Sequence, residues 1–149
     1  MTKEIKLARG EIAIIDDDDF GMISARKWYL AGGYAVCKPI AVGKTYLMHS
    51  VIMDTPIGME TDHINGNRLD NRKSNLRICT TRENQGNSKI RKDNTSGYKG
   101  VSFNKGKYVA FIKVFGIKKY LGRFEKAEDA AEAYASASKK VFGIFGRTK

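Results

Sequence analysis

The last third of the chain constrains the fold most, because three short alternating segments are followed by one helical repeat. Residues 98–103, 108–114 and 118–124 alternate apolar and polar side chains and are separated by turn-forming residues. Residues 127–142 instead space apolar side chains three and four positions apart, and Gly143 follows where such a helix would end. This order predicts a three-stranded antiparallel sheet packed on one helix.

The first 54 residues carry short apolar runs divided by turn signals, which is typical of a small β-rich unit. Four consecutive aspartates occupy residues 16–19. Acidic residues suit a helix N-terminus and no basic residue or histidine adjoins the run, so we interpret it as a solvated helix start rather than a metal site. The predicted elements are a strand at 12–15, a short helix at 16–24, and strands at 27–30, 34–37 and 46–48.

The charge of the chain indicates a polyanionic partner. The 149 residues are 42% hydrophobic and 29% charged, as in a folded chain with one ordinary or two small domains. The formal net charge is +11, with 7 basic against 8 acidic residues in 1–60, 8 against 4 in 61–95, and 12 against 4 in 96–149. Nucleic acid is the first candidate and an anionic membrane the second, and phosphate contacts are expected in the last two thirds.

Several classes are disfavoured by what the chain lacks. No apolar run approaches the roughly 18 residues of a membrane span, and the first residues lead into no signal-peptide core. Cys37 and Cys79 form no C-x-x-C motif, and the two histidines are not in paired spacing, so zinc is not expected. We interpret both cysteines as small buried residues in a reducing cytoplasm.

A polar hinge at 86–97 suggests a domain boundary. Upstream of it, Thr80 and Glu83 have the spacing of a capping box and predict a helix start. The predicted organisation is a scaffold at 1–54, a catalytic segment at 55–92 and a DNA-binding domain at 93–149.

The middle segment holds residues suited to phosphodiester hydrolysis. That reaction needs a group that offsets negative charge, a base that deprotonates water and a group that holds the base. Asp62 and His63 are adjacent, so on an extended strand they face opposite sides, one available to a metal ion and the other to water. Asn75 and Asn84 follow, the latter on the predicted helix. By themselves these residues also fit a satisfied polar turn.

Residues 49–87 resemble the HNH nuclease family, in particular the homing endonucleases of phages and introns. The matching elements are Asp62-His63-Ile64-Asn65-Gly66, Asp70-Asn71, Asn75-Leu76-Arg77 and Thr81-Arg82-Glu83-Asn84. The resemblance implies that His63 is the general base and that Asn75 orients its ring. It also implies that Asp62 and Asn84 hold one divalent ion, with Asn84 standing where many members have a histidine. Such an all-oxygen site favours Mg²⁺ or Mn²⁺ over zinc.

His49 matches a family position that is usually followed by arginine, whereas Ser50 follows it here. We interpret His49 as structural and leave a phosphate contact open. The 54 residues that precede the motif resemble the leading segment of the same phage-type nucleases and are expected to form a scaffold beneath the active site.

Residues 96–146 resemble an AP2 DNA-binding domain. The matching elements are Gly97-Tyr98-Lys99-Gly100-Val101, residues 107–112, Tyr120-Leu121-Gly122-Arg123-Phe124 and residues 127–134. A sheet of this kind can enter the major groove. By alternation Ala110, Ile112 and Leu121 should face the helix. The residues expected to face DNA by alternation are Phe111, Lys113, Lys118 and Tyr120.

The family's DNA-contact positions are only partly retained in this chain. They fall on Lys99, Ser102, Asn104, Lys113, Lys118, Tyr120 and Arg123. Several family arginines and tryptophans are replaced by Ser102, Asn104 and Tyr120, so the resemblance implies a grip on the DNA backbone and no particular base preference.

These inferences predict an α+β protein: an HNH ββα-metal finger on a small β-rich scaffold, followed by an AP2 domain. The first hypothesis is a divalent-metal-dependent endonuclease of the homing or mobile-element type that acts as a monomer in the cytoplasm of a bacterial host or phage-infected cell. It would nick double-stranded DNA and leave 5′-phosphate and 3′-hydroxyl ends. The alternative is a non-catalytic AP2-type DNA-binding regulator. Membrane binding is disfavoured, because the basic residues lie on alternating strands rather than on an amphipathic helix.

Overall fold

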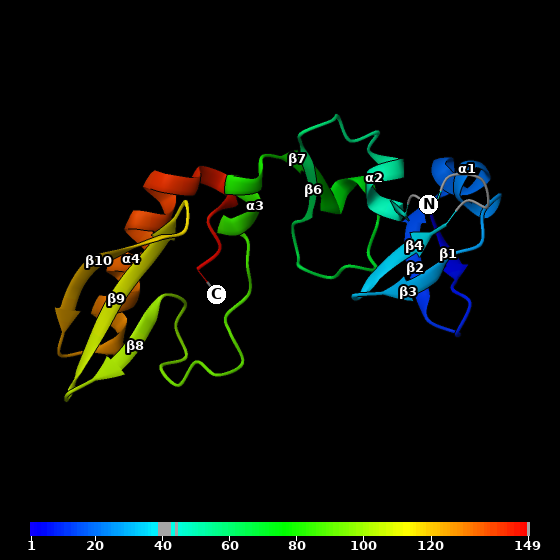
Figure 1. Ribbon diagram of the computed structural model, residues 1–149. Coiled ribbons are helices and arrows are strands. Elements are labelled where there is room, and N and C mark those ends of the chain that lie inside the picture. Colours follow the sequence, from blue (N-terminus) through cyan, green and yellow to red (C-terminus); the bar gives the residue numbers. More distant parts are fainter. Residues whose placement is uncertain (39–42, 44, 149) are drawn as a thin grey trace. The chain divides into compact units, whose positions relative to one another are not determined.

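The computed structural model describes residues 1–38, 43 and 45–148, and the chain divides into two compact units, 1–80 and 81–149 (Figure 1). Each unit has its own apolar core. The segment 55–92, expected to form one catalytic piece, spans this division. Its β-hairpin belongs to the first unit and its helix, α3 (Thr81–Gly86), to the second.

Short antiparallel sheets build the first unit. The strand pairs and sheets are β1 (Thr2–Lys6) with β2 (Ile12–Asp16); β3 (Tyr29–Ala31), β4 (Tyr34–Cys37) and β5 (Tyr46–Leu47) in that order; and β6 (Glu60–His63) with β7 (Leu76–Cys79). The short helices are η1 (Asp17–Asp19), α1 (Phe20–Ser24), α2 (Met48–Ile52) and η2 (Lys73–Asn75). The predicted strands at 12–15 and 34–37 are confirmed. The helix predicted at 16–24 begins at Asp17, as η1, and continues as α1 to Ser24. The strand predicted at 46–48 ends at Leu47, because α2 begins at Met48.

One core connects the N-terminal strands with the hairpin of β6 and β7. Trp28 is only 2% exposed and donates a hydrogen bond from Nε1 to the carbonyl of Ile23 at 2.8 Å. Leu76 of β7 packs into the same core, so the hairpin rests on the strands that precede it. Cys37 and Cys79 are both buried, as expected. Burial of these apolar side chains is what fixes the hairpin in place.

The second unit is a three-stranded antiparallel sheet with one long helix. Its elements after α3 are β8 (Val101–Asn104), β9 (Lys107–Val114), β10 (Ile117–Phe124), α4 (Ala127–Phe142) and η3 (Gly143–Phe145), with β9 central in the sheet. Tyr134 and Phe142 of α4 pack with Ile112 of β9 against one sheet face. The predicted sheet and helix are confirmed, and the fold is mixed α and β as expected. The sheet's membership of the AP2 family stays a prediction.

Tight two-residue turns join these strands. Phe115 and Gly116, between the paired residues Val114 and Ile117, both have positive φ (51° and 78°). Two positive φ values define the turn that best matches the twist of an antiparallel hairpin. The same geometry recurs between β3 and β4, where Gly32 and Gly33 have φ of 58° and 83°. The turn geometry therefore sets the strand register of the β3–β4 and β9–β10 hairpins, in agreement with the alternation of apolar and polar residues.

No helix within the described residues is both long and apolar enough to pass through a lipid bilayer.

Candidate active site

Asp62 and His63 lie on β6, paired across the hairpin with Arg77 and Leu76. Successive residues of a strand face opposite sides, so the two side chains diverge as the sequence predicts. Arg77 donates from Nη2 and Nε to Oδ2 of Asp62 at 2.8 and 3.0 Å. Both Asp62 and His63 are buried, at 7% and 4% exposure. The hairpin thus buries a carboxylate and an imidazole at adjacent positions of one strand, with their side chains on opposite faces.

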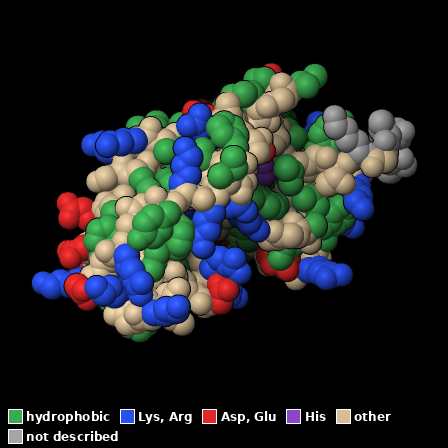
Figure 2. Space-filling model, turned by 60° about the vertical axis from the view of Figure 1, so that its left-hand side comes forward, with side chains coloured by type: hydrophobic (Ala, Val, Ile, Leu, Met, Phe, Trp, Pro, Cys, Tyr) green, Lys and Arg blue, Asp and Glu red, His purple; other side chains and the backbone are tan. Residues whose placement is uncertain are grey.

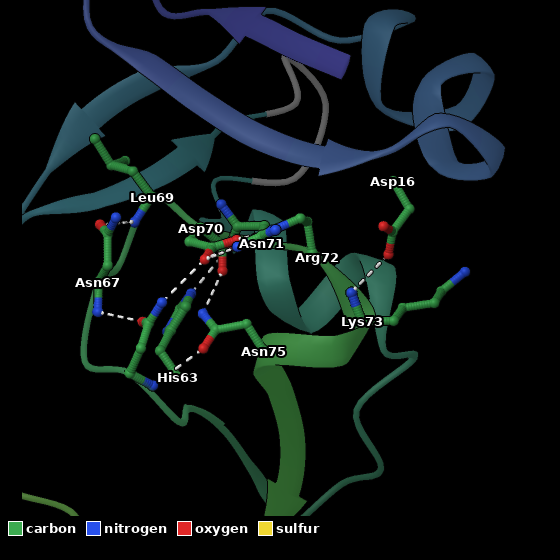
Figure 3. A network of polar contacts seen from close by, with 10 residues as sticks. Asp16, His63, Asn67, Leu69, Asp70, Asn71, Arg72, Lys73 and Asn75 are labelled. Carbon is green, nitrogen blue, oxygen red and sulfur yellow. Dashed lines mark hydrogen bonds and ion pairs between the residues drawn. The ribbon is translucent and has the colours of Figure 1, made fainter. Parts of the chain in front are cut away.

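The His63 ring is oriented by Asn71, whose side-chain oxygen lies 3.1 Å from Nε2 (Figure 3). An amide oxygen only accepts hydrogen bonds, so this contact favours the tautomer with the proton on Nε2 and the lone pair of the neutral ring on Nδ1. Asn71 is wholly buried, and its backbone N–H donates to the carbonyl of Ile14 at 2.7 Å. Burial lowers the pKa of His63, while the contact with Asn71 and the nearby carboxylate of Asp62 partly oppose the shift. A neutral imidazole with a defined tautomer is suited to accept a proton.

Asn75, expected to orient the His63 ring, has its described contacts elsewhere (Figure 3). Its Oδ1 accepts from the backbone N–H of Asn65 at 3.0 Å, and its Nδ2 donates to the carbonyl of Asp70 at 2.8 Å. These bonds close the loop between β6 and β7. Asn75 therefore holds the loop that carries Asn71, and a direct role on the ring stays a prediction.

The acidic run after β2 anchors the far end of this loop. Lys73 donates from its backbone N–H to Oδ2 of Asp16 at 2.8 Å (Figure 3). Its Nζ donates to Oδ1 of Asp19 at 2.7 Å. Asp19 is only 5% exposed. The interpretation of residues 16–19 as a solvated helix start is therefore wrong for Asp19, which is buried, although a helix does begin at Asp17. The basic partner of Asp19 lies 54 residues away along the chain, so local sequence context gives no sign of it.

His49, on α2, packs edge-on against His63 with 4.8 Å between ring centroids. Tyr34 of β4 contacts both rings, at 5.3 Å from His49 and 6.1 Å from His63. Burial, and secondarily the His63 ring, lower the pKa of His49 to about 4, so it is neutral near pH 7. Its Nδ1 is buried without a hydrogen-bond partner among the described residues. His49 thus packs in the layer of rings beside His63, and both the structural interpretation and a phosphate contact stay predictions.

The carboxylate of Asp62 is the kind of ligand that a hard divalent cation takes. Mg²⁺ and Mn²⁺ need only one or two protein carboxylates when water and a phosphate complete their coordination. Asp62 supplies one such carboxylate beside His63. Across the described part of the chain no cluster of three His, Cys, Asp or Glu residues could hold a metal alone, so an ion at Asp62 would take oxygens from elsewhere. Asn84, the second expected ligand, lies on α3 in the other unit, and its joining Asp62 stays a prediction.

Most of the expected DNA contacts share the sheet face away from α4. Phe111 and Tyr120 meet edge to face with 5.6 Å between ring centroids, and Nζ of Lys118 lies 3.8 Å from the centre of the Phe111 ring. Lys113 pairs with Lys118 across the strands, and Arg123 follows further along the same face. The strand register places these predicted DNA-contact residues on the sheet face away from α4: Ser102, Asn104, Lys113, Lys118, Tyr120 and Arg123.

Lys99 differs from the rest of the expected DNA-contact set. It precedes β8, and its Nζ donates to the carbonyl of Gly86 at 2.7 Å. Burial, with the nearby charge of Arg147, lowers the pKa of Lys99 to about 8. In this arrangement Lys99 ties the segment before the sheet to α3, and its contact with DNA stays a prediction.

Sequence reasoning missed three side chains near His63. Asn71 belongs to a recognised motif, yet the role on the ring was assigned to its neighbour Asn75. Tyr34 and Arg68 were not singled out, because only the folded chain brings β4 against the loop between β6 and β7. Arg68 donates from Nη1 to the carbonyl of Gly32 at 2.8 Å, across 36 positions.

The paired strands present a neutral imidazole next to a carboxylate, an arrangement that is compatible with phosphodiester hydrolysis. Comparison with known proteins agrees: residues 54–85 match the family model described as HNH endonuclease. The chain is 31% identical over 144 residues to an uncharacterized HNH endonuclease of Acanthamoeba polyphaga mimivirus, covering 92% of this chain and 74% of the relative. The protein belongs to the HNH endonuclease family.

A second relative matches a shorter stretch. Protein 3.8 of Escherichia phage T7 is 48% identical over 50 residues, which cover 34% of this chain and 41% of that protein. No solved structure matches the chain.

Proposed function

We propose that this protein hydrolyses phosphodiester bonds of double-stranded DNA in a reaction that depends on one divalent ion. Membership of the HNH endonuclease family supports nuclease activity. The observation that carries the proposal is the His63 ring, buried beside Asp62 and held at Nε2 by Asn71. In the proposed mechanism Nδ1 of His63 accepts the proton of the attacking water, and the bond to Asn71 keeps the ring aimed at it.

Asp62 and Asn84 would hold the ion, Mg²⁺ or Mn²⁺. When bound, such an ion offsets negative charge on the phosphate and on the leaving oxygen. Arg77 already neutralises Asp62, so we expect this ion pair to loosen when a cation competes for the carboxylate. Each chain carries one His63, so we propose that a monomer nicks one strand in each binding event and leaves 5′-phosphate and 3′-hydroxyl ends.

We propose that the sheet of the second unit holds the duplex in the manner of an AP2 domain. Lys113, Lys118 and Arg123 offer positive charge, and Phe111 and Tyr120 offer aromatic surface between them. Lys and Arg side chains are spread between hydrophobic ones over the face shown in Figure 2. Polar and basic side chains on a sheet suit phosphate contacts in a groove. The viral and phage sources of the relatives support a role in an infected cell, as in homing or another mobile-element activity.

A plasmid assay tests this proposal. Supercoiled DNA incubated with the protein and Mg²⁺ or Mn²⁺ should become open-circular, and EDTA should stop the conversion. His63→Ala should slow nicking by at least about 100-fold, the usual worth of a general base, with DNA affinity nearly unchanged. Plasmid that stays supercoiled with every metal and pH, although the protein binds it, would favour the non-catalytic regulator.

A further inference from the structure

The positive charges around His63 are not all neutralised. Arg77 is ion-paired with Asp62, Arg72 with Asp70, and Lys73 with Asp19, each at 2.6 to 2.8 Å. Arg68, in the same loop, contacts a backbone carbonyl and an aromatic ring and, among the described residues, no carboxylate. Its side chain is exposed. Arg68 therefore keeps its full charge while its neighbours have theirs balanced.

Arg68 is nonetheless held in a defined position. Its guanidinium carbon lies 4.4 Å from the centre of the Tyr34 ring, and Nη1 donates to the carbonyl of Gly32 at 2.8 Å. The side chain passes over Gly33, where a Cβ would come within 3.4 Å of its Cδ and Nη1. The glycine turn and the Tyr34 ring together restrict the guanidinium. Less side-chain conformational entropy is therefore lost when Arg68 binds a ligand.

The same Tyr34 ring contacts His63 and His49, so Arg68 sits on the aromatic layer that lines the imidazole. Its charge is felt at the His63 ring, where it helps to lower the pKa. One of five guanidinium N–H groups is used by Gly32, and the others remain available in a planar fork that matches phosphate oxygens. A positioned, uncompensated cation beside a general base suits an anionic substrate group.

We propose that Arg68 binds the scissile phosphate of DNA and stabilises the negative charge that builds on it during hydrolysis. This inference rests on the proposed nuclease function and assigns to it a phosphate ligand besides the metal ion. Because the contact strengthens as charge develops, Arg68 should contribute more to the rate than to the affinity.

The test compares Arg68→Ala and Arg68→Lys with Arg26→Ala, a matched loss of an exposed arginine in the same unit. Nicking of a duplex that spans a mapped cleavage position is measured under single-turnover conditions at rising enzyme concentration. Arg68→Ala should lower the maximal rate about 100-fold and change duplex affinity in EDTA less than about threefold. Arg68→Lys should recover part of the rate, since it keeps the charge without the fork, and Arg26→Ala should match the unmodified protein.

A DNA duplex with one uncharged linkage distinguishes loss of a phosphate contact by Arg68→Ala from a general structural effect of the substitution. A methylphosphonate at the scissile position removes the charge that Arg68 would meet, so Arg68→Ala should cause less than a threefold further loss on that duplex. A methylphosphonate one nucleotide away should leave the 100-fold penalty intact. A penalty that persists on the neutral scissile linkage, or an Arg68→Ala variant that nicks at the unmodified rate, overturns the inference.

The result for His63→Ala distinguishes failure of the nuclease proposal from failure of the proposed role of Arg68. If the unmodified protein nicks DNA, His63→Ala does not, and Arg68→Ala does so at full speed, only the role of Arg68 fails. If the unmodified protein nicks nothing with any metal, the nuclease proposal fails and this inference fails with it. Melting temperatures within about 3 °C of each other would show that each variant is folded.

Discussion

The first unit, residues 1–80, carries 11 basic and 10 acidic side chains, whereas the second, residues 81–149, carries 16 and 6. In the first unit buried carboxylates such as Asp62 and Asp70 are ion-paired and hold the loop around His63. In the second unit the described ion pairs, at Asp93 and Glu125, lie at exposed positions. In the first unit the charged residues pair with one another around His63. In the second unit the net charge of +10 is suited to binding a polyanion.

The histidines and the tryptophan are divided in the same way. Both histidines and Trp28, the single tryptophan, belong to the first unit. Acid titration of histidine should therefore affect one unit, and tryptophan fluorescence should report on that unit alone. These differences allow the comparison to be tested without separating the units.

The largest expected effect is on the second unit, from Gly100→Ala. Gly100 has φ of +72°, and a Cβ there would lie 2.1 Å from Cδ2 of Tyr134. Backbone strain and overpacking together should cost about 4 kcal/mol. Circular dichroism in urea should show an early loss of the sheet and helix, while the Trp28 fluorescence transition stays where it was.

Gly106→Ala is the matched control, because Gly106 also has positive φ (+78°) but nothing lies within 4 Å of its added Cβ. It should cost about 1 kcal/mol, from strain alone. Equal effects of the two substitutions would contradict the packing of Tyr134 over Gly100. A simultaneous shift of the Trp28 transition would show that the units unfold together.

The next effect is acid sensitivity of the first unit. The pKa of His49 is lowered to about 4 in the fold, against 6.5 when unfolded. Below pH 6.5 the unfolded chain takes up the proton first, so stability is full above that pH and is lost as the pH falls toward 4. The loss should reach about 3 kcal/mol. Urea unfolding followed by Trp28 fluorescence at pH 7 and pH 4.5 measures it.

His49→Phe keeps a buried ring and removes the titrating group. The variant should therefore unfold at more nearly the same urea concentration at the two pH values. A pH dependence as steep as that of the unmodified protein would exclude His49 as its source.

A smaller effect is expected from Asn71→Ala. Loss of the hydrogen bond to Nε2 frees the His63 ring to rotate, which should lower the nicking rate about 10- to 100-fold. Stability should fall by about 1 to 3 kcal/mol, because Asn71 is fully buried. Single-turnover nicking and urea unfolding give the two values. Asn67→Ala, in the exposed part of the same loop, is the control, and a rate loss as large there would contradict the orienting role of Asn71.

Local patterns predicted the second unit well. Core-facing apolar residues recur about every 3.6 positions in the helix over 127–142 and every second position in the central strand, Lys107–Val114. Both patterns can be recognised within the element itself. The first unit depends more on distant contacts. β1 was not predicted, since its pairing with β2 is visible only once the two strands meet.

The site shows the same limit at the level of single residues. Asp62 and His63 were found because they are adjacent in a motif. Their partners Arg77 and Asn71 depend on the hairpin register and loop path, and the stack of Arg68 on Tyr34 joins residues 34 positions apart. Contacts of this kind come from tertiary structure, so spacing along the chain could not assign them.

The most direct test measures nicking and DNA binding in parallel for His63→Ala and for the double variant Lys113→Ala, Lys118→Ala. His63→Ala should lose nicking at saturating DNA and keep its affinity. The lysine variant should bind about 10-fold more weakly, its salt-dependence slope should be shallower by about 0.9 for each phosphate that the lysines no longer neutralise, and it should still nick at the full rate when saturated. If both variants instead show the same proportional fall in rate and in affinity, hydrolysis and DNA binding are not carried by separate sets of residues.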